Sequence, residues 1–232
     1  MRKFFVLLFI LISTKGFTQE VRDFGIWGTI AYGAEITKNL DFSIEQEVRM
    51  EQNATTPGVI FTNLGVDYSV LEQFQIGFNY RFLLNDRPDG VYGHRHRIML
   101  DLQVRERYQQ WTFAYRARGQ SEVRTINYSN ELGLAPTLDL RNTIKTVYRL
   151  NRRFDIYASF DLRMLVRDAR VPDYTAIDRF RYRLGTDILV KRDQSLGLFI
   201  QHQREVDVQN PEVEFTIGVE FKFGGRRRLM ET

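Results

Sequence analysis

Two histidines beside a loop sequence are the first residues whose types and spacing suggest chemistry. His94 and His96 flank Arg95 and follow a segment that contains Asp86 and Asp89. Imidazole and carboxylate groups bind zinc, but a structural zinc site takes four protein ligands. Two histidines fall short of that set. Asp86 and Asp89 lie in "NDRPDG", a turn sequence in which aspartates are common for conformational reasons. We therefore assign no metal and no cofactor.

Support for catalysis is equally thin. His202 lies in "FIQHQRE" in register with apolar positions, and no serine stands two residues away to complete a nucleophile–base pair. Asp168 and Asp173 form an acidic pair of the kind that rim-located proteases use, but "RVPD" is again a turn sequence. The chain has no phosphate-binding glycine loop and no nucleophile elbow. We assign no catalytic residue and keep a hydrolase of lipid or peptide as an alternative.

Charged residues at every second position form a much larger set. They alternate with apolar residues in "RIMLDLQVRERY" and "DRFRYRLGTDILVK". Facing side chains on neighbouring strands stand about 4.5–5.5 Å apart at Cβ, and a buried lone charge costs several kcal/mol, so we expect them to pair. The predicted charge network comprises Glu45, Glu47, Arg49, Arg81, Arg97, Asp101, Arg105, Arg107, Arg116, Arg118, Arg141, Asp161, Arg163, Arg181, Arg183 and Asp187.

The elements that must position these charges are long β-strands. Period-two alternation predicts strands over 24–36, 40–52, 59–70, 74–84, 94–108, 111–121, 138–150, 154–167, 178–191, 196–207 and 213–223. They exceed the usual five or six residues and suit tilted membrane strands of roughly 9–11 residues with extensions. Short connections alternate with long ones, as in bacterial barrels, whose short turns are periplasmic.

The composition of the polar face decides what the apolar face meets. A soluble β-sandwich also alternates, but its solvated face more often carries Lys than the Arg, Asp and Glu found here. We therefore predict that the apolar residues face lipid and that the charges face a lumen. Backbone groups in lipid must all be paired, so the sheet must close. The expected fold is a closed, antiparallel, up-and-down transmembrane β-barrel, and a secreted soluble sandwich remains the alternative.

The number of strands is a difficulty, because single-chain bacterial barrels have an even number and eleven segments are predicted. We expect ten or twelve strands and favour twelve; residues 24–36 and 122–137 are the segments that we suspect. Aromatic residues near strand ends predict girdles at the membrane interfaces. They are Trp27, Tyr32, Phe61, Tyr68, Phe74, Tyr108, Trp111, Tyr148, Phe154, Phe180 and Phe223.

The first residues predict export. Arg2 and Lys3 precede the apolar run "FFVLLFILI", which is too short to span a bilayer and is typical of a signal peptide. We expect cleavage near Thr18, with 1–18 as signal peptide and 19–232 as one barrel domain with a short C-terminal tail. Three of the 33 basic residues and none of the 29 acidic ones lie in 1–18, so the formal charge falls from +4 to +1. Nucleic acid is therefore not an expected partner.

The last strand resembles the C-terminal signal that the outer-membrane barrel-assembly machinery reads. In "TIGVEFKF" the matching residues are Thr216, Gly218, Phe221 and Phe223, and "GGRRRLMET" follows where the usual signal ends the chain. The mature chain also resembles an uncharacterised Gram-negative outer-membrane family, catalogued as a domain of unknown function. Trp27, "IEQEVRMEQ", "RHRIMLDLQVRERY" and "RFRYRLGTDILVKRDQSLGLFIQHQ" carry the resemblance. It implies a barrel in the outer membrane and no known activity.

The predicted function is an integral outer-membrane barrel with an Arg/Glu-lined lumen, in contact with membrane lipid. Its lumen has either a structural or binding role or a role in passage of a small anionic solute. We favour a plugging salt-bridge network, because water-filled porins need about 16 strands. Sequence does not give the oligomeric state.

Overall fold

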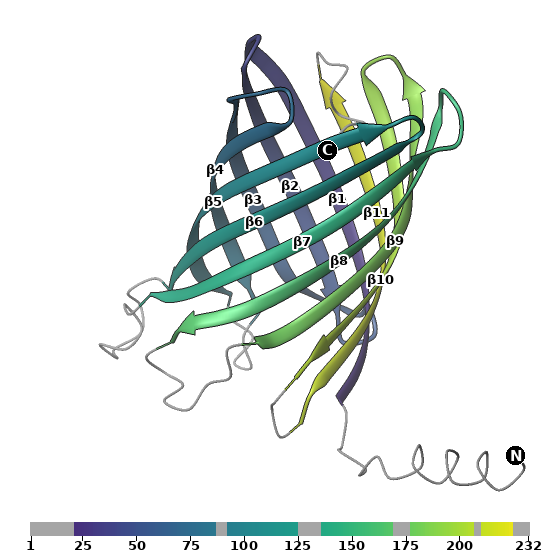
Figure 1. Ribbon diagram of the computed structural model, residues 1–232. Coiled ribbons are helices and arrows are strands. Elements are labelled where there is room, and N and C mark those ends of the chain that lie inside the picture. Colours follow the sequence, from purple (N-terminus) through teal and green to yellow (C-terminus); the bar gives the residue numbers. More distant parts are fainter. Residues whose placement is uncertain (1–20, 87–91, 125–135, 169–176, 207–209, 225–232) are drawn as a thin grey trace, which may run out of the picture.

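The computed structural model describes residues 21–86, 92–124, 136–168, 177–206 and 210–224, which form a closed barrel of tilted strands (Figure 1). The strands are β1 Val21–Thr37, β2 Leu40–Glu51, β3 Thr56–Ser69, β4 Phe74–Asn85, β5 Gly93–Tyr108, β6 Trp111–Arg124, β7 Thr137–Arg149, β8 Phe154–Arg167, β9 Ile177–Lys191, β10 Gln194–Glu205 and β11 Glu212–Gly224. A closed all-β barrel was predicted, and this prediction is confirmed. No helix long and apolar enough to cross a membrane occurs among the described residues.

The strand count corrects the expectation of twelve. Within the described residues the barrel has eleven strands, and ten neighbouring pairs are antiparallel. The eleventh pair, β1 with β11, runs parallel from Val21↔Glu212 to Gly33↔Gly224. A barrel with an odd number of strands can close if its first and last strands pair in parallel. The rule that bacterial barrels have an even number of strands assumes that they pair antiparallel. The suspected first segment is therefore part of the wall as β1.

The connections define two rims of the barrel. The short-turn rim carries the connections 38–39, 70–73, 109–110, 150–153 and 192–193. The long-loop rim carries 52–55, 86–92, 125–136, 168–176 and 206–211, of which the structure describes a part. Because β1 and β11 run in the same direction, β1 starts at the long-loop rim and β11 ends at the short-turn rim.

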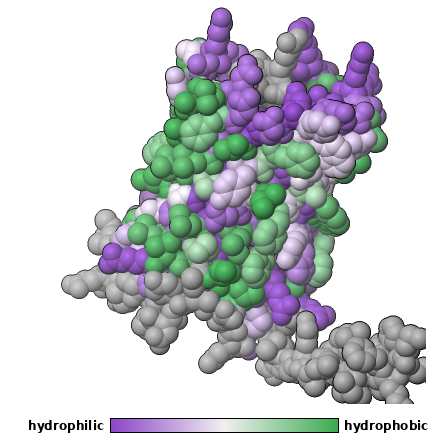
Figure 2. Space-filling view, in the orientation of Figure 1, coloured by the Kyte–Doolittle hydropathy of each residue, from purple (hydrophilic) through white to green (hydrophobic). Residues whose placement is uncertain are grey.

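The outer face of the barrel is apolar, as the alternation predicts. Ile30, Ile144 and Ile200 are 56–58% exposed on it, and hydrophobic residues cover the wall between more hydrophilic ends (Figure 2). Aromatic residues gather near the short-turn rim, where the rings of Trp111 and Tyr148 lie 4.7 Å apart. These rings form part of the predicted girdle.

Two residues of the predicted girdle lie elsewhere. Trp27 and Phe61 face inward and are each 2% exposed. The reason is register: Trp27 shares its side of β1 with Gly25 and Thr29, and the outward positions on either side are Ile26 and Gly28. The membrane-interface prediction for Trp27 and Phe61 used their positions near strand ends. Whether a side chain faces outward or into the lumen is determined by the period-two alternation.

The inside of the barrel is polar and narrow, and many of its side chains are buried. Asp155, Gln201 and Thr216 are each 2% exposed, while large apolar residues cover the outside. A soluble protein has the opposite distribution, with polar groups outside and apolar ones within. Only two small apolar clusters occur inside among the described residues; one contains Trp27, Tyr157 and Phe199, and the other Val59, Phe61 and Leu83.

Candidate functional site

All sixteen residues of the predicted charge network lie on the inward face. They come from seven strands, β2 and β4–β9, because residues at every second position of a strand share one side. Most are buried or half-buried; Arg107, near the short-turn rim, is exposed. The lumen of the barrel is therefore the place where the charges meet.

Many of these arginines are paired with carboxylates on the same strand or on a strand one or two places away in the sheet. Arg118 Nε and Nη2 donate to the two oxygens of Asp101, both at 2.6 Å. Arg141 Nη2 donates to Asp161 Oδ1 at 2.7 Å, and Thr143 donates to the other oxygen of Asp161 at 2.8 Å. Further pairs are Arg49–Glu47, Arg81–Glu45, Arg97–Glu122, Arg163–Asp178 and Lys222–Asp187.

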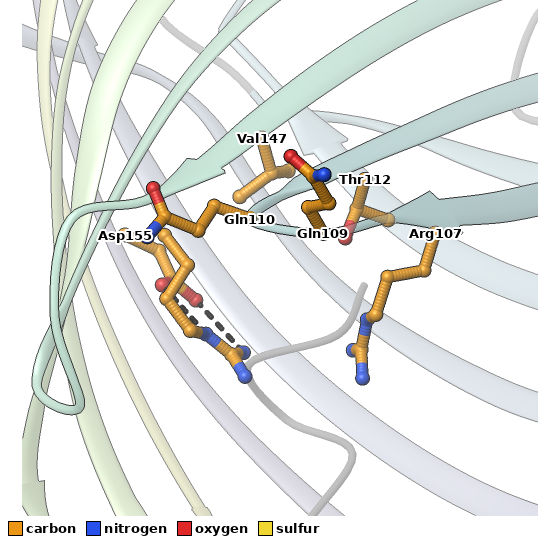
Figure 3. A pocket seen from close by; sticks show the side chains of 7 residues that line it. Arg107, Gln109, Gln110, Thr112, Val147 and Asp155 are labelled. Atoms are coloured by element: carbon orange, nitrogen blue, oxygen red, sulfur yellow. Dashed lines mark hydrogen bonds and ion pairs between the residues drawn. The ribbon is translucent and has the colours of Figure 1, made fainter.

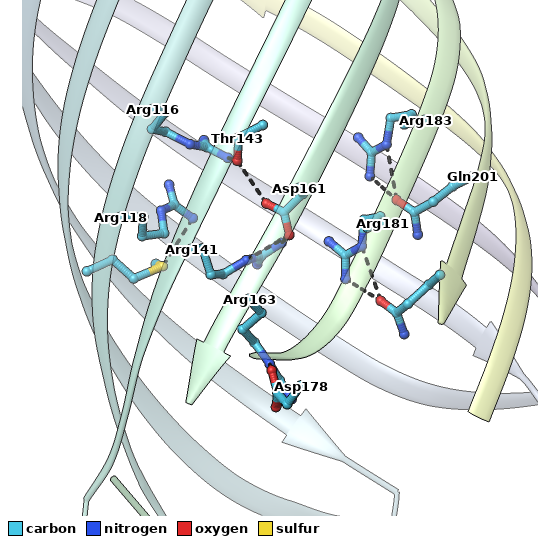
Figure 4. Close-up of polar contacts among 12 residues, drawn as sticks. Arg116, Arg118, Arg141, Thr143, Asp161, Arg163, Asp178, Arg181, Arg183 and Gln201 are labelled. Carbon is cyan, nitrogen blue, oxygen red and sulfur yellow. Dashed lines mark hydrogen bonds and ion pairs between the residues drawn. The ribbon is translucent and has the colours of Figure 1, made fainter. Parts of the chain in front are cut away.

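Two arginines of β9 have neutral partners instead. Arg183 Nε and Nη2 both donate to Gln201 Oε1, at 3.1 and 2.7 Å. Arg181 repeats this fork with Gln203 Oε1, at 3.1 and 2.5 Å. Figure 4 shows these two forks beside the carboxylate-paired Arg141 and Arg163. Within the described part of the chain, neither Arg181 nor Arg183 forms a salt bridge.

Aromatic rings lie among the guanidinium groups at the same level of the lumen. The Trp27 ring has the Cζ atom of Arg49 3.8 Å from its centroid, with those of Arg181 and Arg183 at 5.5 and 5.7 Å. Phe199 packs edge-on against Trp27 and lies 3.9 Å from the Arg183 guanidinium. Such contacts stabilise a cation, and more strongly where water is excluded.

A second aromatic contact lies on β3, two strands away from β1. Phe61 on β3 has Arg81 Cζ 3.7 Å and Arg49 Cζ 5.2 Å from its ring centroid. Arg49 thus lies between the rings of Phe61 and Trp27. Met99 on β5 is only 1% exposed. Rings, guanidinium groups and acids together narrow the lumen at this level, where Arg181 and Arg183 stay half-buried, and this is not the geometry of a wide aqueous pore.

The short-turn rim contains a small recess. Its volume of about 30 Å³ is lined by Arg107, Gln109, Gln110, Thr112, Val147, Arg149 and Asp155. Arg149 Nε donates to Asp155 Oδ1 across it at 3.2 Å (Figure 3). The space holds a few waters and is too small for an organic substrate.

The histidines face outward. His96 Nδ1 lies 2.7 Å from the Tyr80 hydroxyl, and the His202 ring lies 4.7 Å from that of Phe215. The lipid-side register predicted for His202 is what the structure shows. No group of three His, Cys, Asp or Glu residues that could hold a metal occurs among the described residues. Asp89 and Asp173, members of the two weighed acidic sets, lie outside the described residues.

The four residues of the predicted assembly signal lie on β11. Thr216 and Gly218 face the lumen and are buried, whereas Phe221 and Phe223 face outward. Thr216 donates to Glu214 Oε1 at 2.9 Å. The expected signal peptide, residues 1–18, lies outside the described residues.

Sequence reasoning missed the partners that distinguish one arginine from another. Gln201, Gln203 and Phe199 were not candidates, although all three share the register of Gly197 on the inward side of β10. The available signal was the alternation in "SLGLFIQHQ", where Leu198, Ile200 and His202 take the other side. A polar residue opposite an arginine was expected to be an acid, and glutamine was overlooked.

Solved structures similar to the chain are membrane barrels. LpxR from Salmonella typhimurium matches with a TM-score of 0.50 and 9% identity, covering 79% of this chain and 83% of that one. A bacterial polysaccharide outer membrane secretin matches with a TM-score of 0.48 and 15% identity over 81% of this chain and 64% of its own. The NanC porin matches with a TM-score of 0.46 and 11% identity, covering 81% and 90%. At these identities the likeness to LpxR shows the fold alone.

Sequence comparison places the chain in a family without assigned activity. No curated protein matches it. A family model matches residues 24–214, from near the start of β1 to the start of β11. The match covers most of the barrel wall, including every strand that contributes to the charge network. The chain therefore belongs to the family described as "Protein of unknown function (DUF2490)".

Proposed function

We propose that the protein is an integral outer-membrane barrel whose narrow, charged lumen has a binding or structural role. The observation that carries this proposal is the inverted distribution of polarity. Ile30, Ile144 and Ile200 on the outer face are more than half exposed, while Asp155 and Gln201 inside are almost fully buried. Burial of the apolar face in hydrocarbon is worth about 25 cal/mol per Å², and closure pairs the backbone groups that lipid cannot satisfy.

The proposed location is the outer membrane of a Gram-negative bacterium. A closed barrel, strands longer than the globular norm and asymmetric rims support it. By the same rule the short-turn rim faces the periplasm. The proposed partners are membrane lipid along the outer face and the barrel-assembly machinery at β11, through Thr216, Gly218, Phe221 and Phe223.

Extraction and electrophoresis test the membrane part of the proposal. We expect the mature protein to stay in the envelope after a carbonate wash and to need detergent for release. The unheated barrel should migrate differently from the boiled chain, because paired strands resist SDS. Release by carbonate would contradict the proposal, as would a single mobility with and without heating.

Passage of a small solute is the second candidate, and the aromatic–arginine packing bears on it. Because Trp27 and Phe61 are each 2% exposed in mid-lumen, we expect the wild-type protein to give no stable conductance in planar bilayers. Trp27→Ala removes the ring that Arg49 and Phe199 contact and should produce measurable current. Trp111→Ala, on the outer face, is the matched control and should stay silent. Stable wild-type conductance would instead favour passage.

A rim-located hydrolase gains no supporting observation. Its candidate histidines contact aromatic groups on the outer face, as the Tyr80–His96 and His202–Phe215 contacts show. A screen of lipid and peptide hydrolysis, with His94, His96 and His202 each changed to alanine, would detect such an activity directly.

A further inference from the structure

We propose that the lumen next to Trp27 is a binding site for a small oxyanion, a carboxylate, phosphate or sulfate group. The site consists of Trp27, Arg181, Arg183 and Gln201, from β1, β9 and β10. It deepens the proposed binding role and rests on it, because it requires the lumen that the barrel encloses. Two buried hydrogen-bond donors of the site lack acceptors among the described residues, and its positive charges outnumber the acids beside them.

Two neutral donors of this site have no partner among the described residues. They are the indole Nε1–H of Trp27 and the amide Nε2–H₂ of Gln201, and both side chains are 2% exposed. A buried donor without an acceptor costs about 1–3 kcal/mol. The orientation of the Gln201 amide follows from its contact with Arg183, since its oxygen accepts both bonds from that guanidinium. Its nitrogen must therefore find another acceptor.

The guanidinium groups add charged donors at the same place. Each arginine carries five N–H donors, and Arg181 and Arg183 each direct Nε and Nη2 to one glutamine oxygen. A glutamine oxygen accepts the bond and leaves the charge uncompensated. Both guanidinium carbons lie within 5.7 Å of the Trp27 ring centroid, and Arg49 lies 3.8 Å from it. Three cations thus surround one indole.

The acids near the site are already engaged. Asp161 faces Arg181 across the β8–β9 pair, but it accepts from Arg141 and Thr143. Glu214 accepts from Gln203 and Thr216, and Glu47 accepts from Arg49 and Thr29. None of the three forms a salt bridge with Arg181 or Arg183 within the described chain. Because the partners of Glu214 are neutral, its negative charge also remains, and Arg49, Arg181 and Arg183 set against Glu47 and Glu214 leave one positive charge in excess around Trp27.

An oxyanion satisfies these groups together. The Nε–Nη2 edge of each arginine is taken by a glutamine, but the terminal Nη1 and Nη2 groups keep N–H donors that match the spacing of carboxylate and phosphate oxygens and can bind them through two parallel hydrogen bonds. Indole and amide N–H groups donate to the same oxygens, and electrostatic contacts are stronger in a site with little water. A spherical halide cannot use two forks in this way. The geometry therefore favours an oxyanion over chloride.

Trp27 is itself the reporter for the test, because the chain has two tryptophans and the other, Trp111, is on the outer face. Trp111→Phe leaves Trp27 as the single emitter. We expect sodium phosphate, and separately sodium acetate, to change the emission of this folded variant in detergent saturably. Sodium chloride at the same ionic strength should not. A saturable response to acetate and phosphate identifies the shared oxyanion chemistry; a response to one alone identifies the group that the site selects.

Arginine variants in the same background locate the site. Arg183→Gln removes one fork, and we expect the apparent dissociation constant to rise at least about tenfold. Arg183→Lys retains the charge without the guanidinium fork, and its apparent dissociation constant should lie between those of the parent and of Arg183→Gln. Arg107→Gln, the same charge change at the short-turn rim, should stay within about twofold of the parent. Unboiled electrophoretic mobility establishes that each variant is a folded barrel.

The outcomes separate this proposal from the one on which it rests. A protein that stays in the membrane and folds, but whose Trp27 emission ignores phosphate and acetate, overturns the oxyanion site alone. Equal responses to chloride and phosphate overturn it as ionic screening, and equal loss in Arg183→Gln and Arg107→Gln overturns its location. Failure of the carbonate and mobility tests overturns the membrane barrel itself.

Discussion

Two walls of the lumen use the same residue type in different ways. On β6 and β7, Arg118 and Arg141 meet carboxylates at 2.6–2.7 Å. On β9, Arg181 and Arg183 meet glutamine oxygens at nearly the same distances, 2.5–2.7 Å. The hydrogen bonds are alike, but of these four arginines only Arg118 and Arg141 have a counter-charge; Arg116, also on β6, donates to the neutral Thr143. The difference teaches that hydrogen-bond satisfaction and charge neutrality are separate properties of a buried arginine.

The largest expected effect comes from breaking a carboxylate–arginine pair of the first wall, the one whose Arg118 and Arg141 meet acids. Asp161→Ala leaves the Arg141 guanidinium without its carboxylate, and both side chains are at most 15% exposed in the native barrel. We expect the free energy of unfolding to fall by about 3–5 kcal/mol, the cost of stranding one member of a buried ion pair. Urea unfolding in detergent micelles, followed by tyrosine and tryptophan emission, measures it.

Glu106→Ala is the matched control for that measurement. Glu106 is an exposed acid on β5 that points out of the lumen, so its removal should change the stability by less than about 0.5 kcal/mol. Equal midpoints for the two variants would mean that the carboxylate-paired wall contributes nothing through its pairing.

A smaller effect is expected from displacing the ring of Phe199, which contacts Arg183 of the β9 wall. A methyl group at Gly218 would overlap the ring of Phe199, which supports the Arg183 guanidinium 3.9 Å away. Gly218→Ala should therefore cost about 1–3 kcal/mol, the usual range for overpacking. Gly119→Ala, whose new methyl would have Leu140 Cδ2 at 3.8 Å as its nearest neighbour, should be tolerated. Identical unfolding curves for these variants would show that Phe199 moves freely.

The smallest change in stability should come from giving an arginine of the β9 wall a carboxylate partner like those of Arg118 and Arg141. Gln201→Glu keeps the shape of the side chain and gives Arg183 a carboxylate. We expect a gain of about 1 kcal/mol, because hydrogen bonds between charged groups exceed those to neutral ones. The same variant should lose the response of Trp27 emission to phosphate. A retained response would show that the charge surplus of β9 does not attract anions.

The fold could be predicted from the sequence because one physical rule determines it along the whole chain. Period-two alternation located all eleven strands and the inward side of the predicted charge network, which includes Arg97, Arg141 and Arg183. Strand number could not be derived in the same way. It depends on how β1 and β11 meet, and pairing between the two ends of the wall leaves no local pattern.

The charge network was predicted as a set and not as pairs. Alternation shows which side Asp101 and Arg118 take, but their contact depends on the register between β5 and β6, where they stand directly opposite. The partners of Arg181 and Arg183 were missed for the same reason. Trp27 was assigned to the interface from its position near a strand end, although its neighbours Gly25 and Thr29 indicated the lumen.

The parallel seam between β1 and β11 has a consequence for experiments in cells. A label joined ahead of Val21 would emerge at the long-loop rim, and one joined after Gly224 would emerge at the opposite rim. A barrel of even strand number returns both ends to the same compartment. If the barrel lies in the outer membrane, as proposed, a protease added to intact cells would reach one label and spare the other, so a pair of epitope fusions tests both the proposed orientation of the wall and the parity of its strands.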